Sequence, residues 1–175
     1  RATDTFFYKV GEMVGVNRLV NWSNKFGLDK QTGSDLPGEV GGLVPSPEWK
    51  KRVKGENWFL GNTYHMSIGQ GDLAITPIEI NMATNAVLTG KLCPPKIVGE
   101  STCRELGIKK DTSDFIKEGM IKACSEGGTA NVFFDWNKNE SDDKKVACKT
   151  GTAETGVNDK THAWFSVVAP ASPNE

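Results

Sequence analysis

The chain has 175 residues, of which 37% are hydrophobic and 25% are charged, and its formal net charge is -1. This length predicts about one domain, which buries roughly two thirds of the surface of its unfolded chain. The small net charge excludes a general attraction to nucleic acids or to anionic membranes. These residues contain no apolar run long enough for a membrane helix and no signal-peptide pattern at their start.

The four cysteines lack the C-x-x-C spacing of a zinc or redox site, so we predict no metal site. Their number is also too low for a small disulfide scaffold. Cys93 and Cys103 flank a short segment and are candidates for a disulfide in an oxidising compartment. We expect instead that all four are separate buried thiols.

The first 62 residues predict two helices followed by a long connection. Apolar residues recur three or four positions apart between Phe6 and Phe26, which is typical of two short amphipathic helices broken near Gly15. Asn17 is the expected N-cap of the second helix and Gly27 its end. Residues 28–62 are rich in Gly, Pro, Asp and Ser, so we predict a surface connection with little regular structure.

Two further helices are predicted in the middle of the chain. Thr76 and Pro77, followed by Glu79, combine a capping residue, a proline at the first helical position and a capping box, so a helix begins there and ends at Gly90. Its apolar face is predicted to contain Ile80, Ala83, Ala86 and Val87. A second helix is predicted over 113–125, capped by Thr112 or Ser113 and ended by Gly127 and Gly128. Its inward-facing residues are expected to be Phe115, Ile116, Met120 and Ala123.

The last part of the chain predicts a charged loop and two strands. Residues 137–145 are highly polar, whereas 146–148 form a short apolar run and 162–169 are rich in β-branched and aromatic residues. The segment KTGT, 149–152, follows the apolar run directly, so we expect it at the end of the first strand.

The residue types at 149–152 suit an anionic, acyl-bearing ligand. The ammonium of Lys149 attracts a carboxylate, and Thr150 and Thr152 supply hydroxyl donors. Gly151 lets a ligand approach the backbone without a Cβ atom in the way. Free N–H groups at a strand edge pair with an extended peptide or stabilise an oxyanion. The tripeptide alone is also compatible with an ordinary strand-to-turn junction.

Several sequence blocks together resemble the transpeptidase domain of class B penicillin-binding proteins, especially the elongation type. They occur in the family's order over nearly the whole chain: DTFFYKVG, FGLDKQTGSDLPGE, GLVPSPEWK, GNTYHMSIGQGDLAITPIEI, GMIKACSEGGTA, KTGTAE and HAWFSVVAP. The resemblance implies an α+β fold in which an antiparallel sheet is covered by helices on both faces.

The resemblance also implies an activity and a set of partners. In this family a serine attacks the D-Ala-D-Ala end of a peptidoglycan stem peptide, and an acyl-enzyme forms that a second stem peptide resolves. β-Lactam antibiotics acylate the same serine, and no cofactor is implied. Lys149, Thr150, Gly151 and Thr152 correspond to the residues that bind the substrate carboxylate and the oxyanion. A glycosyltransferase partner and an anchored location outside the cytoplasmic membrane are further implications.

The sequence departs from the family pattern at two motifs. The nucleophilic S-x-x-K motif belongs upstream of DTFFY, and the one literal match, at Ser141 and Lys144, lies in the charged loop and is interpreted as coincidental. The second motif, S-x-N or S-x-D, falls on Ala2, Thr3 and Asp4, so Asp4 fits but alanine replaces the serine. We therefore expect residues 1–175 to be a partial domain without the S-x-x-K segment and without the final strand and helix.

Three functional hypotheses follow from these observations. The first is part of a serine D,D-transpeptidase, inactive as an isolated segment. The second is a degenerate domain that binds peptides or partner proteins without catalysis. A serine β-lactamase or sensor relative ranks last, because such proteins are not expected to combine the SIGQG, GLVPSPEWK and HAWF blocks.

Overall fold

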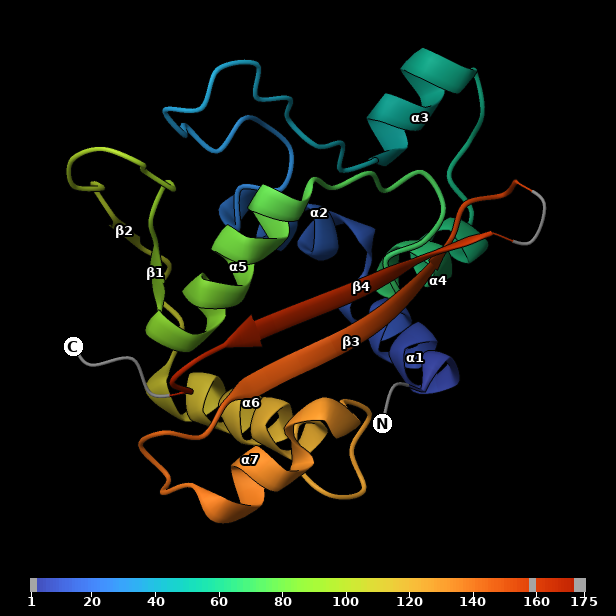
Figure 1. Ribbon diagram of the computed structural model, residues 1–175. Helices are drawn as coiled ribbons and strands as arrows, with labels where there is room; N and C mark the ends of the chain where they lie inside the picture. Colours follow the sequence, from blue (N-terminus) through green and yellow to red (C-terminus); the bar gives the residue numbers. More distant parts are fainter. Residues whose placement is uncertain (1–2, 158–159, 172–175) are drawn as a thin grey trace. The chain divides into compact units, whose positions relative to one another are not determined.

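The computed structural model describes residues 3–157 and 160–171, shown in Figure 1. The chain divides into two compact units. Among the described residues, the helical unit comprises 3–80 and 94–101, and the strand unit comprises 81–93, 102–157 and 160–171. None of the helices within the described residues has the length and apolar character needed to cross a membrane.

The helical unit begins with α1 (Asp4–Val14) and α2 (Val16–Lys25), which confirms the two predicted helices. They are separated at Gly15, whose φ of 78° lies in the region that favours glycine. Gly15 also caps α2, so the prediction that Asn17 is the cap was wrong. Gly27, with a φ of 74°, directly follows the C-cap residue Phe26 and ends α2 as predicted.

Residues 28–62 contain more regular structure than predicted. They include α3 (Pro47–Lys54) and the beginning of α4 (Leu60–Ser67). The start of α3 has a local signal, because the Ser46 hydroxyl accepts the Trp49 N–H at 3.1 Å and Pro47 occupies the first turn. The prediction was wrong because the surrounding Gly and Pro residues outweighed this capping pattern.

Close contact between α1 and α4 forms part of the core of the helical unit. A Cβ atom added to Gly11 would lie 2.5 Å from the Cβ of Ser67, so only glycine fits at this crossing. The Tyr8 and Tyr64 rings lie 5.3 Å apart, and the Tyr64 hydroxyl donates to Glu12 at 3.1 Å. The pKa of Glu12 is lowered, first by its hydrogen bond with Lys9 and then by that with Tyr64.

The predicted capping box at the start of α5 (Pro77–Thr89) is confirmed. The Glu79 carboxylate accepts hydrogen bonds from the Thr76 N–H at 2.7 Å and the Thr76 hydroxyl at 2.8 Å. Its other oxygen accepts the Gly42 N–H at 2.8 Å, and the side chain is fully buried. Glu79 therefore fixes both the helix start and the loop that contains Gly42. Gly90 ends α5 as predicted, with a φ of 74°.

The strand unit continues from α5 through two short antiparallel strands, β1 (Lys91–Leu92) and β2 (Arg104–Glu105), to α6 (Lys110–Ala123). The predicted helix over 113–125 exists, but it begins three residues earlier. Ser113 is not its cap, because its buried hydroxyl donates to the Val87 carbonyl at 2.7 Å. Phe115 and Ile116 were predicted to face inward, but both are exposed, with exposed fractions of 77% and 38%. Met120 and Ala123 are half-buried.

The predicted charged loop, 137–145, begins inside α7 (Phe134–Asn139), which follows a single turn of 3-10 helix, η1 (Asn131–Phe133). Asn137 is buried and its side chain forms hydrogen bonds with both backbone groups of Val146. The prediction was wrong because it counted charges, whereas this helix is fixed by a contact nine residues away along the chain.

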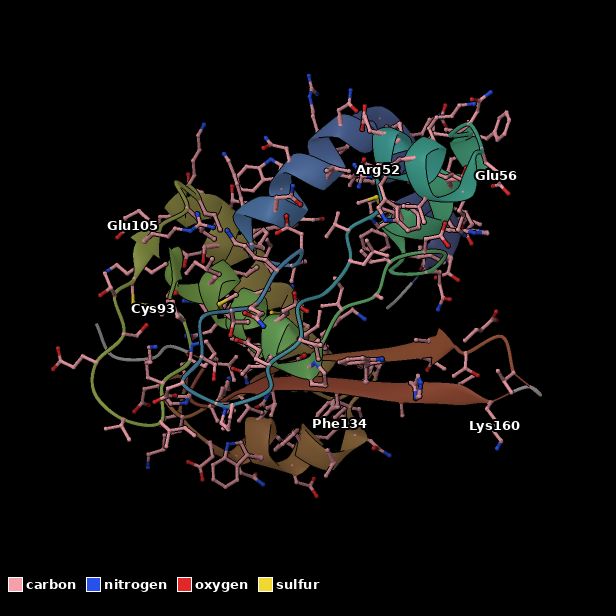
Figure 2. The ribbon with its side chains drawn as sticks, turned by 90° about the horizontal axis from the view of Figure 1, so that it is seen from above. Arg52, Glu56, Cys93, Glu105, Phe134 and Lys160 are labelled. Carbon is pink, nitrogen blue, oxygen red and sulfur yellow. A yellow bond between two sulfur atoms is a disulfide. The ribbon has the colours of Figure 1, made fainter. Side chains whose placement is uncertain are left out.

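The principal sheet of the strand unit is a hairpin of β3 (Ala147–Glu154) and β4 (Thr161–Val168). The pairing is antiparallel and runs from Ala147 opposite Val168 to Glu154 opposite Thr161. Figure 1 shows this long hairpin beside α6 and α7, and in Figure 2 the labelled Lys160 lies near its tip. Both predicted strands are confirmed, and antiparallel strands with helices confirm the α+β class.

All four cysteines form disulfides, so the expectation of separate thiols was wrong. Cys93 is joined to Cys103, which was the alternative considered, and Cys124 is joined to Cys148. The second bond links the end of α6 to the second residue of β3. It could not be predicted from the sequence because the two residues are 24 positions apart and only the packing of α6 on β3 brings them together.

Candidate functional site

Residues 149–152 lie in the middle of β3. The prediction that they lie at the end of the strand was wrong. The strand continues to Glu154 because β4 pairs with it along its whole length. Successive side chains of a strand point to opposite faces. Thr150 therefore shares a face with Cys148 and with its cross-strand neighbour Phe165, while Lys149 shares the other face with Gly151.

One face of the hairpin is covered by the segment after α6. Cys148 is bonded to Cys124, and the Phe165 ring stacks on Phe133 with centroids 6.0 Å apart. Buried Cys124, Ala130, Val146 and Cys148 form the adjoining hydrophobic core. The β3 strand is thus fixed from one face, next to the residues of the candidate site.

The backbone groups of β3 alternate between its two edges. Just before β3, the Lys145 carbonyl accepts the Ala171 N–H at 2.6 Å, and just after it, the Thr155 N–H donates to the Lys160 carbonyl at 3.2 Å. The backbone N–H and C=O groups of odd-numbered residues therefore point toward β4. Because the N–H and C=O of one strand residue point to the same side, even-numbered residues face the other edge. Thr150 and Thr152 therefore direct their N–H groups to the edge opposite β4, where the described residues add no further strand.

The Lys149 side chain is exposed and reaches this same edge, where its ammonium donates to the Thr150 carbonyl. Within residues 3–157 and 160–171, no carboxylate forms an ion pair with it. An unneutralised cation beside outward-facing N–H groups forms a local positive potential. Such an arrangement attracts an anion that carries its own hydrogen-bond acceptors.

Thr150 has a hydroxyl partner that the sequence analysis did not identify. Its Oγ1 donates to Oγ1 of Thr129 at 2.8 Å. Thr129 is held by a tight turn after α6, where its N–H and that of Ala130 both donate to the Ala123 carbonyl. A Cβ on Gly128 would lie 2.3 Å from that carbonyl oxygen, so the turn requires glycine. The GGTA sequence was the available signal, but it was interpreted only as a helix end.

Gly151 lies opposite Trp164 in the hairpin, on the same face. A Cβ added to Gly151 would lie 3.3 Å from the Cβ of Trp164, which is tighter than ordinary contact. A larger residue would crowd Trp164 and would also cover the backbone between Lys149 and Thr152. The predicted reason for glycine, close approach of a ligand to the backbone, stays a prediction beside this packing reason.

Ser141 does not have the environment of a nucleophile. It is exposed in the turn after α7, where its carbonyl accepts the Lys144 N–H at 2.9 Å. Its hydroxyl forms a hydrogen bond with Asp143 that lowers the pKa of that carboxyl group. The Lys144 ammonium lies 4.0 Å from Glu140 and is also exposed. The structure therefore provides no buried lysine behind this serine, in agreement with a coincidental match.

Asp4 lies in the first turn of α1 and is exposed. It belongs to the helical unit, whereas residues 149–152 belong to the strand unit. Its participation in the same site remains a prediction. Ala2, which occupies the position of the motif serine, lies outside the described residues.

The family model of the penicillin binding protein transpeptidase domain matches residues 2–175. The chain belongs to this family. The match includes the β3 strand with its KTG sequence and the helix start at Thr76, so the resemblance inferred from the sequence blocks is confirmed.

Relatives and solved structures agree with this assignment. The peptidoglycan D,D-transpeptidase MrdA of Escherichia coli K12 is 31% identical over 168 residues, which cover 87% of this chain and 26% of that protein. MrdA of Acinetobacter baumannii is 43% identical over 81 residues, or 46% of this chain and 12% of that protein. The chain thus spans about a quarter or less of these relatives.

The same fold occurs in solved penicillin-binding proteins. The Helicobacter pylori protein PBP2 is 30% identical, with a TM-score of 0.82, and the match covers 96% of this chain and 31% of that one. Pseudomonas aeruginosa PBP2 in complex with WCK 5153 is 26% identical, with a TM-score of 0.81 and coverage of 96% and 39%. These matches confirm the predicted fold family.

Proposed function

We propose that this chain forms the substrate-carboxylate and oxyanion subsites of a peptidoglycan D,D-transpeptidase. Lys149 and the Thr150 hydroxyl bind the terminal carboxylate of a D-Ala-D-Ala stem peptide or of a β-lactam. Gly151 keeps the strand edge open, and the Thr152 N–H donates to the oxyanion. The observation that carries this proposal is the convergence on one edge of β3 of outward-facing N–H groups and an exposed ammonium, which forms no ion pair within the described residues.

The proposed reaction is an acyl transfer. A serine hydroxyl attacks the carbonyl of the penultimate D-Ala, the bond to the terminal D-Ala breaks, and that residue leaves as the free amine after gaining a proton. The amine of a second stem peptide then attacks the acyl-serine ester, forms the cross-link and releases the serine. Asp4, the third position of the second family motif, is proposed to take part in the catalytic machinery.

The nucleophile is proposed to come from an S-x-x-K segment outside residues 1–175. Ser141, the literal match within the chain, lacks a buried lysine partner. In this proposal residues 149–152 position and polarise the substrate, and the serine forms the covalent bond. The catalytic and binding functions are thus divided between these residues and the nucleophile segment.

The proposed location is outside the cytoplasmic membrane, where the parent protein is anchored. The two disulfides support this location, because disulfides persist mainly in oxidising compartments. A partner among the cell-wall synthesis proteins, including a glycosyltransferase, is also proposed. Helicobacter pylori PBP2, which is 29% identical to this chain in that structure, has been solved in complex with MreC.

The test is acylation of the complete protein by fluorescent penicillin. Lys149→Ala is expected to slow acylation roughly 10- to 100-fold, the range for losing a hydrogen bond to a charged group. Lys160→Ala is the matched control, because this exposed lysine lies beyond the strand at the hairpin turn and its loss should leave the rate unchanged. Equal rates for Lys149→Ala and the wild type would refute the proposed role of Lys149.

The same labelling assay separates catalysis from the alternative of a binding domain without turnover. The complete protein should be labelled stoichiometrically and should retain the label after denaturation. An unlabelled complete protein that still binds stem peptides would favour the binding domain. The 175 residues alone should remain unlabelled, and Ser141→Ala should change nothing in either protein.

A further inference from the structure

A disulfide and a hydrogen bond join the segment after α6 to β3, and in each segment the two residues that form them are close in sequence. Cys124 is bonded to Cys148, and both residues are fully buried. Thr129, five residues beyond Cys124, meets Thr150, two residues beyond Cys148. The hydroxyl pair lies at the surface, since Thr129 is exposed and Thr150 is half-buried, whereas the disulfide lies in the core.

We propose that Thr129 shares the binding of the substrate carboxylate with Thr150, and that the Cys124–Cys148 disulfide is the positioning element that holds the two hydroxyls together. This inference rests on the proposed function, because it extends the carboxylate subsite by one residue. It assigns a functional consequence to a disulfide that makes no contact with the substrate.

The chemistry of two hydroxyls explains the role of Thr129. Each threonine hydroxyl has one proton and can also accept. When Thr150 donates across the 2.8 Å contact, the Thr129 proton remains free to donate to an anion, and the reverse orientation of the contact frees the Thr150 proton instead. The pair therefore presents a donor whose oxygen position is already fixed, whereas an isolated hydroxyl must select its rotamer when the ligand binds.

The contact between the hydroxyls cannot by itself hold the two segments together. Water competes for both groups at the surface, so a single neutral hydrogen bond contributes little net stability there. The turn at Gly128 fixes Thr129 relative to the end of α6, and the disulfide fixes that end to β3. Thr129 is thus connected to Ala123 by a backbone hydrogen bond, and the neighbouring Cys124 is bonded to Cys148, which lies two residues from Thr150.

The experiment compares acylation of the complete protein by a β-lactam free acid and by the methyl ester of the same compound. Thr129→Val keeps the shape but removes the hydroxyl, so acylation by the acid should fall on the order of tenfold, with less than about a twofold change for the ester. Thr129→Ser should restore the rate with the acid. Equal slowing of acid and ester by Thr129→Val would overturn the proposal, because it would indicate a purely structural role.

The disulfide is tested with paired alanine variants. Replacing Cys124 and Cys148 together should cause the same selective loss with the acid, and adding Thr129→Val should then have little further effect because both changes remove one positioned group. Replacing Cys93 and Cys103 together is the matched control and should leave both rates unchanged. Full additivity of Thr129→Val with the Cys124 and Cys148 pair would overturn the positioning role.

The outcomes distinguish this inference from the proposed function. If neither compound labels the wild type, both are refuted. If the wild type is labelled and Lys149→Ala is slow, but Thr129→Val behaves as the wild type with the acid, only the further inference fails. The Thr129 variants also decide the contribution of Thr129 if the variant without Cys124 and Cys148 does not fold.

Discussion

Asn137 pairs with the backbone of Val146 in both directions. Its Nδ2 donates to the Val146 carbonyl at 3.0 Å and its Oδ1 accepts the Val146 N–H at 2.9 Å. Both residues are buried, with exposures of 4% and 3%. The Asn137 side chain thus satisfies both backbone groups of Val146, as a neighbouring strand would. This contact anchors α7 to the residue that precedes β3, the strand that contains the candidate site.

Asn137→Ala should therefore destabilise the protein strongly. It leaves the Val146 N–H and C=O buried without partners, and each such group costs about 1–3 kcal/mol. We expect a loss of roughly 2–4 kcal/mol in the free energy of unfolding, measured by urea denaturation. Asn139→Ala in the same helix is the control, because Asn139 is exposed and should change stability by less than about 0.5 kcal/mol. Similar losses for both variants would contradict this account.

Gly42→Ala should be one of the most damaging glycine substitutions in the helical unit. The added Cβ would lie 2.6 and 2.7 Å from the two Glu79 carboxylate oxygens and 2.7 Å from the Leu28 carbonyl oxygen. Overpacking of this kind costs typically 1–3 kcal/mol, and the capping contacts of Glu79 would be displaced as well. The change should appear as a lower Tm in thermal denaturation.

Gly61→Ala is the matched control for this prediction. Gly61 lies in α4, and a Cβ added there meets no atom within 4 Å. Alanine should therefore stabilise the helix by roughly 0.5–1 kcal/mol because it restricts the unfolded chain more than glycine does. A lower Tm for Gly61→Ala than for Gly42→Ala would reject the packing argument.

The outward direction of the Thr152 N–H can be tested with proline, which has no backbone N–H. Thr152→Pro should slow β-lactam acylation of the complete protein about 10²- to 10³-fold, as expected for an oxyanion donor. Because the Thr152 N–H does not pair with β4, this substitution breaks no hydrogen bond of the hairpin, and the loss of stability should be modest. Circular dichroism and thermal denaturation would measure that loss.

Ala153→Pro is the comparison for Thr152→Pro. Residue 153 directs its N–H toward β4, so this proline removes a ladder hydrogen bond and should destabilise the hairpin by about 1–3 kcal/mol. If Thr152→Pro unfolds the protein as severely as Ala153→Pro, the assignment of the two edges of β3 is incorrect.

Asp35 should give the helical unit a pH-dependent loop contact. Its carboxylate accepts the Ile97 N–H at 2.8 Å and the Val98 N–H at 3.0 Å, and these hydrogen bonds, in that order, lower its pKa. A carboxyl group with a lowered folded pKa stabilises the fold above its unfolded pKa of about 3.9, and this contribution is lost as the pH falls through the folded value. The amide resonances of Ile97 and Val98 should therefore shift with a midpoint below about pH 3.9 in an NMR titration.

Asp35→Asn is the control for this titration, because the amide side chain does not ionise. The low-pH shift of Ile97 and Val98 should disappear in this variant. A midpoint at or above the ordinary aspartate value in the unmodified protein would contradict the role of the two backbone donors.

Features fixed by contacts between neighbouring residues could be predicted from the sequence. The break at Gly15 and the capping box of Thr76 and Glu79 depend on interactions within a few residues, so the local pattern is sufficient. The same holds for where each of the two strands begins. The family was also identified from the sequence, because several motifs in a fixed order are far more specific than any single one.

Other features were decided only by the tertiary structure, because they depend on residues that are distant in the sequence. The extension of β3 through Thr152 results from pairing with β4, and the burial of Asn137 results from its contact with Val146. The disulfide between Cys124 and Cys148 requires α6 to pack on β3, and the same packing brings Thr129 to Thr150. The sequence thus predicted residues 149–152 as the chemical groups of the candidate site, whereas long-range packing determined their edge, their direction and their hydroxyl partner.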